Sequence, residues 1–392
     1  MKPAVELQAD RPFLPYGCQT IEADDIAAVA ESLSSDYLTT GPKVAEFEKE
    51  FCKVVRAKHC IVVGNGTHAL HLACLAAGLG EGDYAIVPSV TFLATANAVR
   101  YCGADVLFAD VDPSTGLMRP EDALATIEKN PGKKIKAILP VHLTGQTADL
   151  KALREISDKR GMIMIADAAH AVGSISSGLP VGAGIYEHMS IFSFHPVKTI
   201  ALGEGGAITT NDDAMAKKMR TLRGHGMEQK PEQGPWFYTM ENIGYNYRVT
   251  DFQCALGLSQ LAKLDRFILR RRAIVDIYDT LLADLAPVIL PPQRVSKEDP
   301  AWHLYAVRVD FKKLGMTRAE LMTRLRERNI GTQVHYIPVS SQPYYTGLYG
   351  QQNLPGASHY YEHTLSLPLF PKMEDSDAAY VVETLKEICG GE

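Results

Sequence analysis

Lys198 is a lysine whose sequence surroundings favour chemistry at its amine. The apolar run Ile-Phe-Ser-Phe at residues 191–194 precedes it, and the glycine cluster Gly-Glu-Gly-Gly at residues 203–206 follows it. An amine held among apolar neighbours loses hydration, so its pKa falls and the free base can attack a carbonyl carbon. Lys198 is therefore a candidate Schiff-base lysine. The alternative is a solvated loop lysine.

Asp167 supplies a matching carboxylate. It lies 31 positions before Lys198 and directly follows the apolar run Met-Ile-Met-Ile-Ala at residues 162–166. Such a run predicts a buried parallel strand, and open α/β sheets bind ligands at the carboxyl ends of their strands. A carboxylate there keeps a pyridine nitrogen protonated, so that the ring can draw electrons from a carbanion. The pair predicts a site for pyridoxal 5′-phosphate (PLP); alternatively, Asp167 caps the following helix.

Three further side chains suit the same cofactor. His170 follows Asp167 by three residues and is expected to reach the phenolic oxygen of the ring. Phe92 begins a predicted helix and is a candidate to stack on the ring, and Ser193 is a candidate phosphate donor. Each has an ordinary alternative, namely a satisfied structural histidine, a helix-packing phenylalanine and a strand-end hydroxyl.

Residues 64–69 (Gly-Asn-Gly-Thr-His-Ala) match the pattern G-x-G-x-x-A after a predicted strand, which raises a nicotinamide-dependent oxidoreductase as an alternative. That fingerprint requires an acidic residue at the end of the second strand, whereas Glu81 and Asp83 precede the next predicted strand. What remains is a loop that opens a helix. We therefore expect Gly66 and Thr67 to bind the phosphate of PLP.

The composition excludes several classes of protein. A net charge of −6 argues against nucleic acid as a partner. The seven cysteines include no C-x-x-C pair, which indicates reduced thiols in a cytoplasmic protein, and we expect no metal site. Residues 1–10 contain no apolar core of a signal peptide, and no window is apolar enough to span a membrane. We therefore expect a soluble protein that is not exported.

Strand and helix patterns alternate through the first half of the chain. The predicted strands cover residues 60–63, 84–87, 106–109, 135–139 and 162–167, and the predicted helices cover residues 22–34, 43–54, 67–79, 92–101, 121–129 and 149–160. This alternation predicts an α/β fold with a large, doubly wound and mostly parallel sheet.

A chain of 392 residues is too long for one ordinary core, so a second domain is expected. After a strand at 207–210, a helix at 212–222 and a polar loop at 224–235, helical spacing over residues 250–285 predicts one long or kinked helix. A strand at 304–309, a helix opened by Thr317 and a strand ending at His335 and Tyr336 then form a small α+β domain. The predicted division is 1–250, 251–285 and 286–392.

Seven segments together resemble the DegT/DnrJ/EryC1/StrS sugar aminotransferases, from about Tyr16 to the C-terminus. They are residues 39–42 (Thr-Thr-Gly-Pro), 65–67 (Asn-Gly-Thr), 91–95 (Thr-Phe-Leu-Ala-Thr), 167–170 (Asp-Ala-Ala-His), 193–198 (Ser-Phe-His-Pro-Val-Lys), 203–206 (Gly-Glu-Gly-Gly) and 244–248 (Gly-Tyr-Asn-Tyr-Arg). Within the family, residues 193–200, 334–338 and 366–369 most resemble members that act in pseudaminic acid biosynthesis. Asn65 departs from the Ser-Gly or Ser-Ala that many members carry.

The resemblance implies a PLP-dependent homodimer of fold type I, with two active sites at the subunit interface. Lys198 would form the Schiff base as the catalytic residue, with Asp167 and His170 beside the ring. The implied cofactor-binding residues are Gly66, Thr67, Phe92, Asp167, His170, Ser193, Lys198 and, toward the other subunit's cofactor, Asn246. The implied substrate-binding residues are Tyr16, Asp36, Tyr37, Leu38, Thr39, Arg248, His335, Tyr336, Ile337 and Pro338.

The resemblance also implies a reaction. Glutamate would donate its amino group, leaving pyridoxamine 5′-phosphate as the intermediate, and C4 of UDP-2-acetamido-2,6-dideoxy-β-L-arabino-hexos-4-ulose would receive it. Relatives in which histidine replaces the lysine act as dehydratases, so Lys198 favours transamination. The alternatives are another nucleotide-linked 4-keto sugar (legionaminic acid, bacillosamine or perosamine type), a nicotinamide-dependent sugar oxidoreductase, and a non-catalytic regulator.

Overall fold

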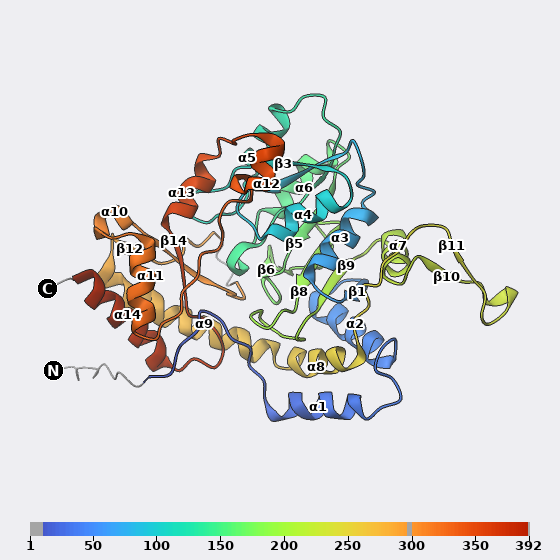
Figure 1. The fold of residues 1–392 in the computed structure, drawn as a ribbon, viewed down its shortest axis with the longest axis horizontal. Helices are drawn as coiled ribbons and strands as arrows, with labels where there is room; N and C mark the ends of the chain where they lie inside the picture. The colour runs from blue at the N-terminus through green and yellow to red at the C-terminus, as the bar shows by residue number, and fades with distance from the viewer. Residues whose placement is uncertain (1–10, 296–299, 391–392) are drawn as a thin grey trace.

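The computed structural model describes residues 11–295 and 300–390. The expectation that the chain has no signal peptide concerns residues 1–10, which lie outside the described residues. Within the described residues the chain is built around a seven-stranded sheet in the order β1-β9-β8-β5-β4-β2-β3 (Figure 1). The strands are β1 (His59–Val63), β2 (Tyr84–Pro88), β3 (Asp105–Ala109), β4 (Ile135–Ile138), β5 (Ile163–Asp167), β8 (Met189–Ser193) and β9 (Gly206–Thr210). Only β9 runs against its neighbours in this sheet, which confirms the predicted α/β fold with a mostly parallel sheet.

Apolar side chains cover both faces of the sheet, because successive side chains of a strand point to opposite faces and most of them here are apolar. On one face, Ile61 and Val63 of β1 pack with helices α3 (Gly66–Ala76), α4 (Leu93–Tyr101) and α7 (Asp213–Arg223). On the other face, Cys60 and Val62 pack with α2 (Pro42–Val55) and α8 (Asp251–Leu261), while Ile138 and Met164 pack with α5 (Pro120–Glu128) and α6 (Leu150–Asp158). The sheet is therefore enclosed between two helix layers.

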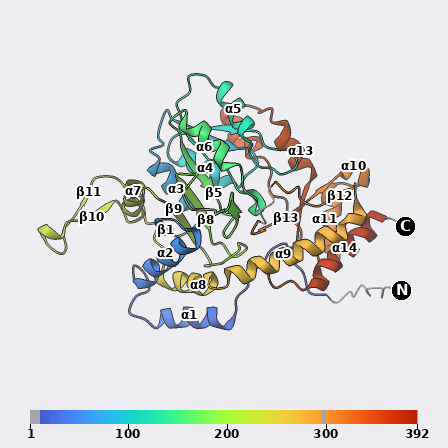
Figure 2. The same cartoon turned by 180° about the vertical axis from the view of Figure 1, so that it is seen from behind.

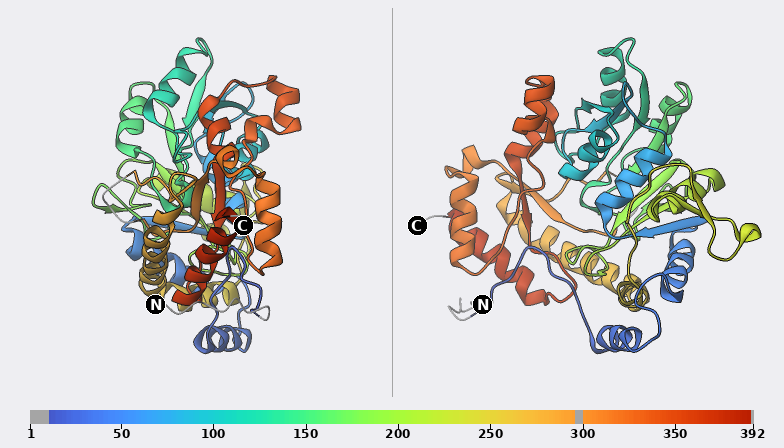
Figure 3. Two further views of the ribbon diagram at one scale, coloured as in Figure 1. Left: turned by 90° about the vertical axis from the view of Figure 1, so that its left-hand side faces the viewer. Right: turned by 45° about the vertical axis from the view of Figure 1, so that its right-hand side comes forward.

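A second core lies in the C-terminal part of the chain, whose helices and strands group beside the large sheet in Figure 3. It contains the sheet of β12 (Ile289–Leu290), β13 (Tyr305–Val309) and β14 (Thr364–Leu367), with helices α9 (Leu264–Leu281), α11 (Arg318–Glu327) and α14 (Asp375–Gly390). Leu14 and Cys18 of the N-terminal arm also pack there, and α9 contributes to both cores. Because α9 packs in both cores, the packing crosses the predicted boundaries. The division into 1–250, 251–285 and 286–392 stays a proposal.

The remaining elements cover the edges of the molecule. Helix α1 (Ala23–Leu33) runs beside α8 (Figure 1), and the ammonium of Lys263, two residues after α8, pairs with Asp25 at 2.8 Å. The long or kinked helix predicted over residues 250–285 is two helices with a break at 262–263, followed by a short 3₁₀ turn. The other short elements are β6 (Ile175–Ser176), β7 (Leu179–Pro180), α10 (Phe311–Leu314), α12 (Pro343–Tyr349) and α13 (Pro355–His363).

Two sequence predictions differ from the structure. The polar loop predicted at 224–235 begins a hairpin of β10 (Met227–Gln229) and β11 (Tyr238–Met240), which projects from the body of the molecule (Figures 1 and 2). The prediction of a strand ending at His335 and Tyr336 was wrong, because these residues lie in an irregular segment. Gln333 makes a single bridge to Ser366 of β14, after which the His335 ring turns inward and bonds the Ser366 hydroxyl.

The carboxyl ends of β1, β5 and β8 meet at one edge of the sheet, which is where the predicted site residues lie. Gly206, the first residue of β9, pairs with both Val63 and Ser193 there. A Cβ atom at Gly206 would lie 2.4 Å from the carbonyl oxygen of Asn65 and 2.8 Å from the nitrogen of Gly66. Glycine is therefore required for the loop at residues 64–66 to approach the sheet.

We expect Gly206→Ala to destabilise the fold and to displace the loop before α3. Contacts this short must be relieved by backbone movement, which costs about 1–3 kcal/mol in a packed core. Urea unfolding measures the loss, and PLP affinity measures the displacement. Gly80→Ala is the control for adding a methyl group, because no heavy atom lies within 4 Å of a Cβ built at that position and its φ is not positive. Equal PLP affinity in the Gly206→Ala variant and the native chain would contradict the account.

None of the helices in the described part of the chain combines the length and the apolar character needed to cross a membrane.

Candidate active site

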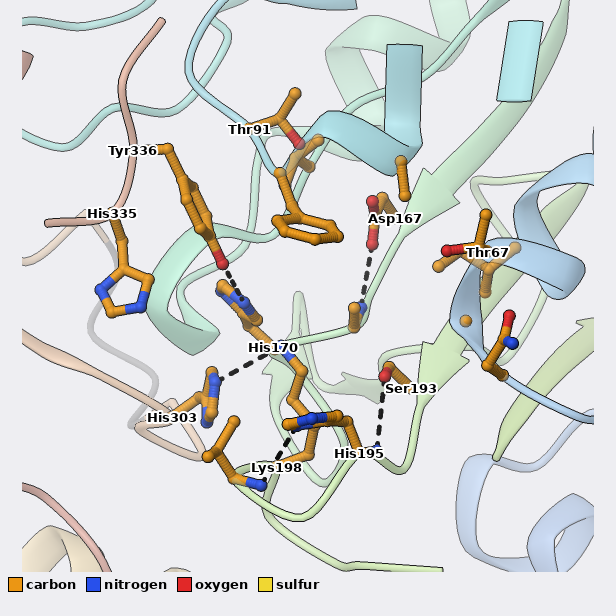
Figure 4. A pocket seen from close by; sticks show the side chains of 18 of the residues that line it. Thr67, Thr91, Asp167, His170, Ser193, His195, Lys198, His303, His335 and Tyr336 are labelled. Atoms are coloured by element: carbon orange, nitrogen blue, oxygen red, sulfur yellow. Dashed lines mark hydrogen bonds between the residues drawn. The ribbon is translucent and has the colours of Figure 1, made fainter. Parts of the chain in front are cut away.

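A cavity of about 600 Å³ opens at the carboxyl edge of the large sheet, beside the C-terminal part of the chain. This volume lies within the range of cofactor and ligand sites. Ten of the predicted site residues line it, and Figure 4 shows seven of them by label. The ten are Tyr16, Gly66, Thr67, Phe92, Asp167, His170, Ser193, Lys198, His335 and Tyr336.

Asp167 is the last residue of β5, and its buried carboxylate is held by two donors. One oxygen accepts a hydrogen bond from the Thr95 hydroxyl at 2.7 Å, and the other accepts from the N–H of Ala169 at 3.1 Å. The Thr95 hydroxyl gives its only proton to Asp167, so the Thr91 hydroxyl donates to Thr95, also at 2.7 Å. Burial raises the pKa of Asp167 above its usual value, against these bonds and the charge of Lys198. The positive charge of a protonated pyridine nitrogen would offset the cost of burying the ionised carboxylate.

Lys198 lies in the loop between β8 and β9, half-buried in the cavity wall. Its backbone N–H bonds the carbonyl of His195 at 2.8 Å, which turns the chain so that the side chain enters the cavity (Figure 4). Burial lowers the pKa of Lys198 from 10.5 to about 8, although the negative charge of Asp167 acts in the opposite direction. A substantial fraction of the amine is therefore unprotonated just above neutral pH, as a nucleophile or base requires.

His170 is neutral and fixed by two bonds. The N–H of Thr144 donates to its Nδ1 at 3.3 Å, so its proton resides on Nε2, which lies 3.2 Å from the Tyr336 hydroxyl. Burial, followed by the positive charge of Lys198, lowers its pKa well below the usual value. Contact between His170 and the phenolic oxygen of a bound ring stays a prediction.

The N-terminus of α3 forms the far end of the cavity. The Asn65 side chain caps this helix by accepting from the N–H of His68 at 2.9 Å. The first N–H groups of a helix have no partner within it, so Gly66 and Thr67 present donors at the positive end of the helix dipole. A Cβ at Gly66 would lie 3.0 Å from that of Ser193, whose hydroxyl lies beside these donors. This end therefore fits a phosphate.

Together these features fit PLP. A buried carboxylate faces the same cavity as a lysine of lowered pKa, and a helix N-terminus with two hydroxyl side chains completes the wall. Gly66, Thr67 and Ser193 would hold the phosphate, Asp167 the pyridine nitrogen, and Lys198 the carbonyl carbon.

Aromatic rings form the mouth of the cavity. The Tyr16 and His335 rings lie 5.4 Å apart, and the Phe92 and Tyr336 rings lie 5.9 Å apart. Burial lowers the pKa of His335 to about 3 and raises that of Tyr336, so both are neutral at physiological pH. Such a wall suits the carbon face of a sugar or a base better than it suits a bare anion.

Several predicted site residues lie outside the cavity of their own chain. They are Asp36, Tyr37, Leu38, Thr39, Asn246, Arg248, Ile337 and Pro338. All of these except Pro338 are exposed. Their expected roles stay predictions, and the structure of one chain does not bring them to Lys198.

Reasoning from the sequence missed two contacts of the site. Thr95 was quoted in a motif without a role, but its hydroxyl bonds both Asp167 and Thr91, which lies two residues before α4 begins. His303 lies 3.5 Å from Lys198 (Nε2 to Nζ) and enters from the segment before β13. Nothing in the pattern around His303 distinguished it from a core residue, because 105 positions separate it from Lys198.

Over residues 11–295 and 300–390, no three His, Cys, Asp or Glu side chains gather in a way that could hold a metal ion.

The fold and this site define a PLP-dependent aminotransferase. The model of the DegT/DnrJ/EryC1/StrS aminotransferase family matches residues 19–386. The chain belongs to this family, as its motifs predicted.

Three similar proteins refine the comparison. The spore coat polysaccharide biosynthesis protein SpsC of Bacillus subtilis (strain 168) is 40% identical over 393 residues, covering 98% of this chain and 99% of SpsC. Helicobacter pylori PseC, an aminotransferase involved in the biosynthesis of pseudoaminic acid, has a TM-score of 0.89 at 27% identity, covering 96% of this chain and 99% of PseC. The putative sugar aminotransferase Spr1654 of Streptococcus pneumoniae, solved in PLP and PMP forms, has TM-scores of 0.87 and 0.89 at 28% identity, with the same coverage.

We expect Thr95→Val to destabilise the protein, because it leaves an oxygen of the buried Asp167 carboxylate without its donor. A buried polar group that loses its partner costs about 1–3 kcal/mol. Urea unfolding of the cofactor-free chain measures the change, and Thr95→Ser, which keeps the hydroxyl, is the matched control. Unchanged stability in the Thr95→Val variant would show that the hydroxyl does not stabilise the buried carboxylate.

Proposed function

We propose that this aminotransferase moves the amino group of L-glutamate to C4 of a nucleotide-linked 4-keto-6-deoxy sugar. The proposed acceptor is UDP-2-acetamido-2,6-dideoxy-β-L-arabino-hexos-4-ulose, as in pseudaminic acid biosynthesis. The observation that carries the amino-transfer chemistry is that Asp167 and Lys198 line one cavity with the N-terminus of α3. Similarity to PseC over 96% of the chain supports the choice of sugar.

Each residue has a defined task in this reaction. PLP, when bound, supplies a ring that withdraws electrons from the carbon bearing the amino group. Asp167, ionised beside the pyridine nitrogen, keeps that nitrogen protonated. The Lys198 amine accepts the α-proton of the donor and returns a proton to the acceptor in the second half-reaction. Gly66, Thr67 and Ser193 bind the phosphate, which fixes the ring against these two side chains.

A second acceptor class has an observation in its favour. SpsC, described by its part in spore coat polysaccharide biosynthesis, is 40% identical to this chain, whereas PseC is 27% identical. A different nucleotide-linked 4-keto sugar, of the legionaminic acid, bacillosamine or perosamine type, is therefore the alternative acceptor. Both candidates require the same chemistry at Lys198 and differ in the groups that the outer cavity must bind.

The acceptor is identified by incubating the holoenzyme with L-glutamate and a panel of UDP-, dTDP- and GDP-linked 4-keto sugars. We expect the UDP-linked L-arabino ketosugar to be converted most efficiently, to a 4-amino product whose stereochemistry is determined by NMR spectroscopy. Lys198→Ala should abolish turnover while leaving the fold intact, since it removes the base. Conversion of only a different ketosugar would contradict the proposed acceptor. Native rates in the Lys198→Ala variant would contradict the proposed role of Lys198 as the base.

We further propose that the active enzyme is a homodimer with shared active sites. Among the described residues that line the cavity, Lys198 is the only lysine or arginine. A diphosphate sugar and a dicarboxylate donor both carry negative charge that needs further cations. Arg248 is exposed and does not line the cavity of its own chain, so we assign it to the cavity of the other subunit.

Two of the exposed segments outside the cavity lie side by side, which supports this arrangement. Thr39 bridges Thr250, which joins the segment 36–39 to the segment 244–250. Apolar side chains accompany them, among them Tyr37 at 57% and Ile243 at 80% exposure. The projecting β10–β11 hairpin adds Trp236 at 75% exposure. A surface of this kind suits a second copy of the chain better than it suits water.

Mixing two inactive variants tests the shared site. If Arg248 acts in the partner's cavity, a dimer of one Lys198→Ala chain and one Arg248→Ala chain has one intact site of two. Random reassembly of equal amounts should therefore restore about one quarter of native activity, because about half of the dimers are mixed. Activity no greater than that of the separate variants would contradict the shared site.

A cytoplasmic setting is part of the same proposal. All seven cysteines are free thiols, and an oxidising compartment would favour disulfides in a chain with this many cysteines. The cysteines lie on separate elements, which is consistent with packing roles.

A further inference from the structure

His303 is the side chain nearest to the Lys198 amine for which the proposed chemistry has no task. It lies in the segment that leads into β13, and its Nε2 is 3.5 Å from Nζ of Lys198 (Figure 4). The His303 ring is 4% exposed and lies 4.4 Å from the His170 ring, centre to centre. This histidine of the C-terminal part of the chain therefore contacts the lysine of the large sheet.

The backbone around His303 is held rigidly. Its N–H bonds the carbonyl of Thr144 at 2.8 Å, and its own carbonyl accepts from the buried guanidinium of Arg271 at 3.2 Å. These bonds fix where the ring can lie. The other ring nitrogen, Nδ1, is buried without a partner in the described structure, so Lys198 is the polar contact that gives the ring its orientation.

We propose that His303 is a positioning residue for Lys198, holding the freed amine in line for transfer of the α-proton. When its amine is free, the long side chain of Lys198 has several rotatable bonds. A hydrogen bond to a fixed ring limits that freedom, and a base must lie within hydrogen-bond reach of the proton that it removes. The inference rests on the proposed role of Lys198 as the base, and it does not depend on which sugar is the acceptor.

The environment keeps His303 uncharged, which this task requires. Burial, followed by the charge of Lys198, lowers its pKa well below the usual value. The groups that act on Lys198 and His303 are Asp167, His170 and His335, with Arg271 behind the ring. A neutral imidazole serves the amine in either tautomer, because Nε2 accepts from the lysine when unprotonated and donates to the free amine when protonated.

The variants of His303 are chosen by whether they keep a group that can both accept and donate a hydrogen bond at the place of Nε2. The amide of His303→Gln can both accept and donate near the place of Nε2, so it should preserve the contact. The ring of His303→Phe fills the space without a hydrogen bond. His303→Asn keeps an amide that is too short to reach Nζ, and it takes the place of the phenylalanine variant if that chain does not fold.

The first test is the single-turnover reaction of the holoenzyme with L-glutamate and with [2-²H]glutamate. We expect His303→Phe or His303→Asn to slow the absorbance change about tenfold or more, with the deuterium isotope effect kept or increased and the half-saturating glutamate concentration within about twofold. His303→Gln should recover most of the rate. An unchanged rate, a loss confined to half-saturation, or equal losses in the glutamine and phenylalanine variants would each overturn the proposal.

His142 provides the matched control. It is a fully buried histidine on the same edge of the sheet, and burial lowers its pKa to about 4. Its Nδ1 accepts from the N–H of Ala148, and it does not line the cavity. His142→Gln should therefore leave the rate and the isotope effect unchanged. A loss in this variant equal to that of His303→Phe would assign the effect to core packing.

A second measurement requires neither activity nor a donor. The cofactor-free full chain is treated with acetic anhydride across a pH series, and acetylation of Lys198 is quantified by peptide mass spectrometry. The native midpoint is expected near pH 8, and His303→Phe should lower it by about one unit, because the ammonium loses an acceptor in a buried site. His303→Gln should match the native chain, whereas identical midpoints in all three would overturn the contact. If native holoenzyme does not react with glutamate, the proposed donor fails and this titration still decides the role of His303.

Discussion

The removal of water from around Asp167 and Lys198 is the constraint on which the site depends. Burial pushes the carboxylate toward its neutral form and the amine toward its free base, and their mutual attraction opposes both shifts. Each group is thereby left ready for a partner that the protein itself does not supply. A protonated pyridine ring with a carbonyl substituent satisfies both at once, since it offers a cation to the carboxylate and an electrophilic carbon to the amine.

The rest of the fold brings these two groups to one cavity. The carboxyl ends of β5 and β8 deliver Asp167 and the loop of Lys198, while the close approach of Gly206 admits the loop that begins α3. The C-terminal part then closes the cavity with His303 and His335, which are neutral and buried. Lys198 thus shares its cavity with a carboxylate from the sheet and contacts a histidine from the C-terminal part of the chain.

The sequence predicted much of this because the relevant signals are local. The apolar run before Asp167 and the glycines after Lys198 indicated a strand end and a tight loop, and residues 64–67 indicated a helix N-terminus. The hairpin at β10–β11 was missed because its polar and aromatic residues show no clean alternation. His303 was missed because its role comes from a contact across 105 positions. The exposed residues Asn246 and Arg248 were assigned to the site by family resemblance alone, and their roles stay predictions, since one chain does not bring them to the cavity.

Borohydride reduction of the PLP-loaded protein, followed by peptide mapping, tests the central claim most directly. Reduction makes the bond between the cofactor and its lysine permanent, so the modified peptide reports which amine lies against the carbonyl carbon. The account predicts one phosphopyridoxyl group per chain, on Lys198, with none on the Asp167→Ala variant at PLP concentrations that saturate the native chain. A label on a different lysine, or stoichiometric labelling that is indifferent to Asp167, would contradict it.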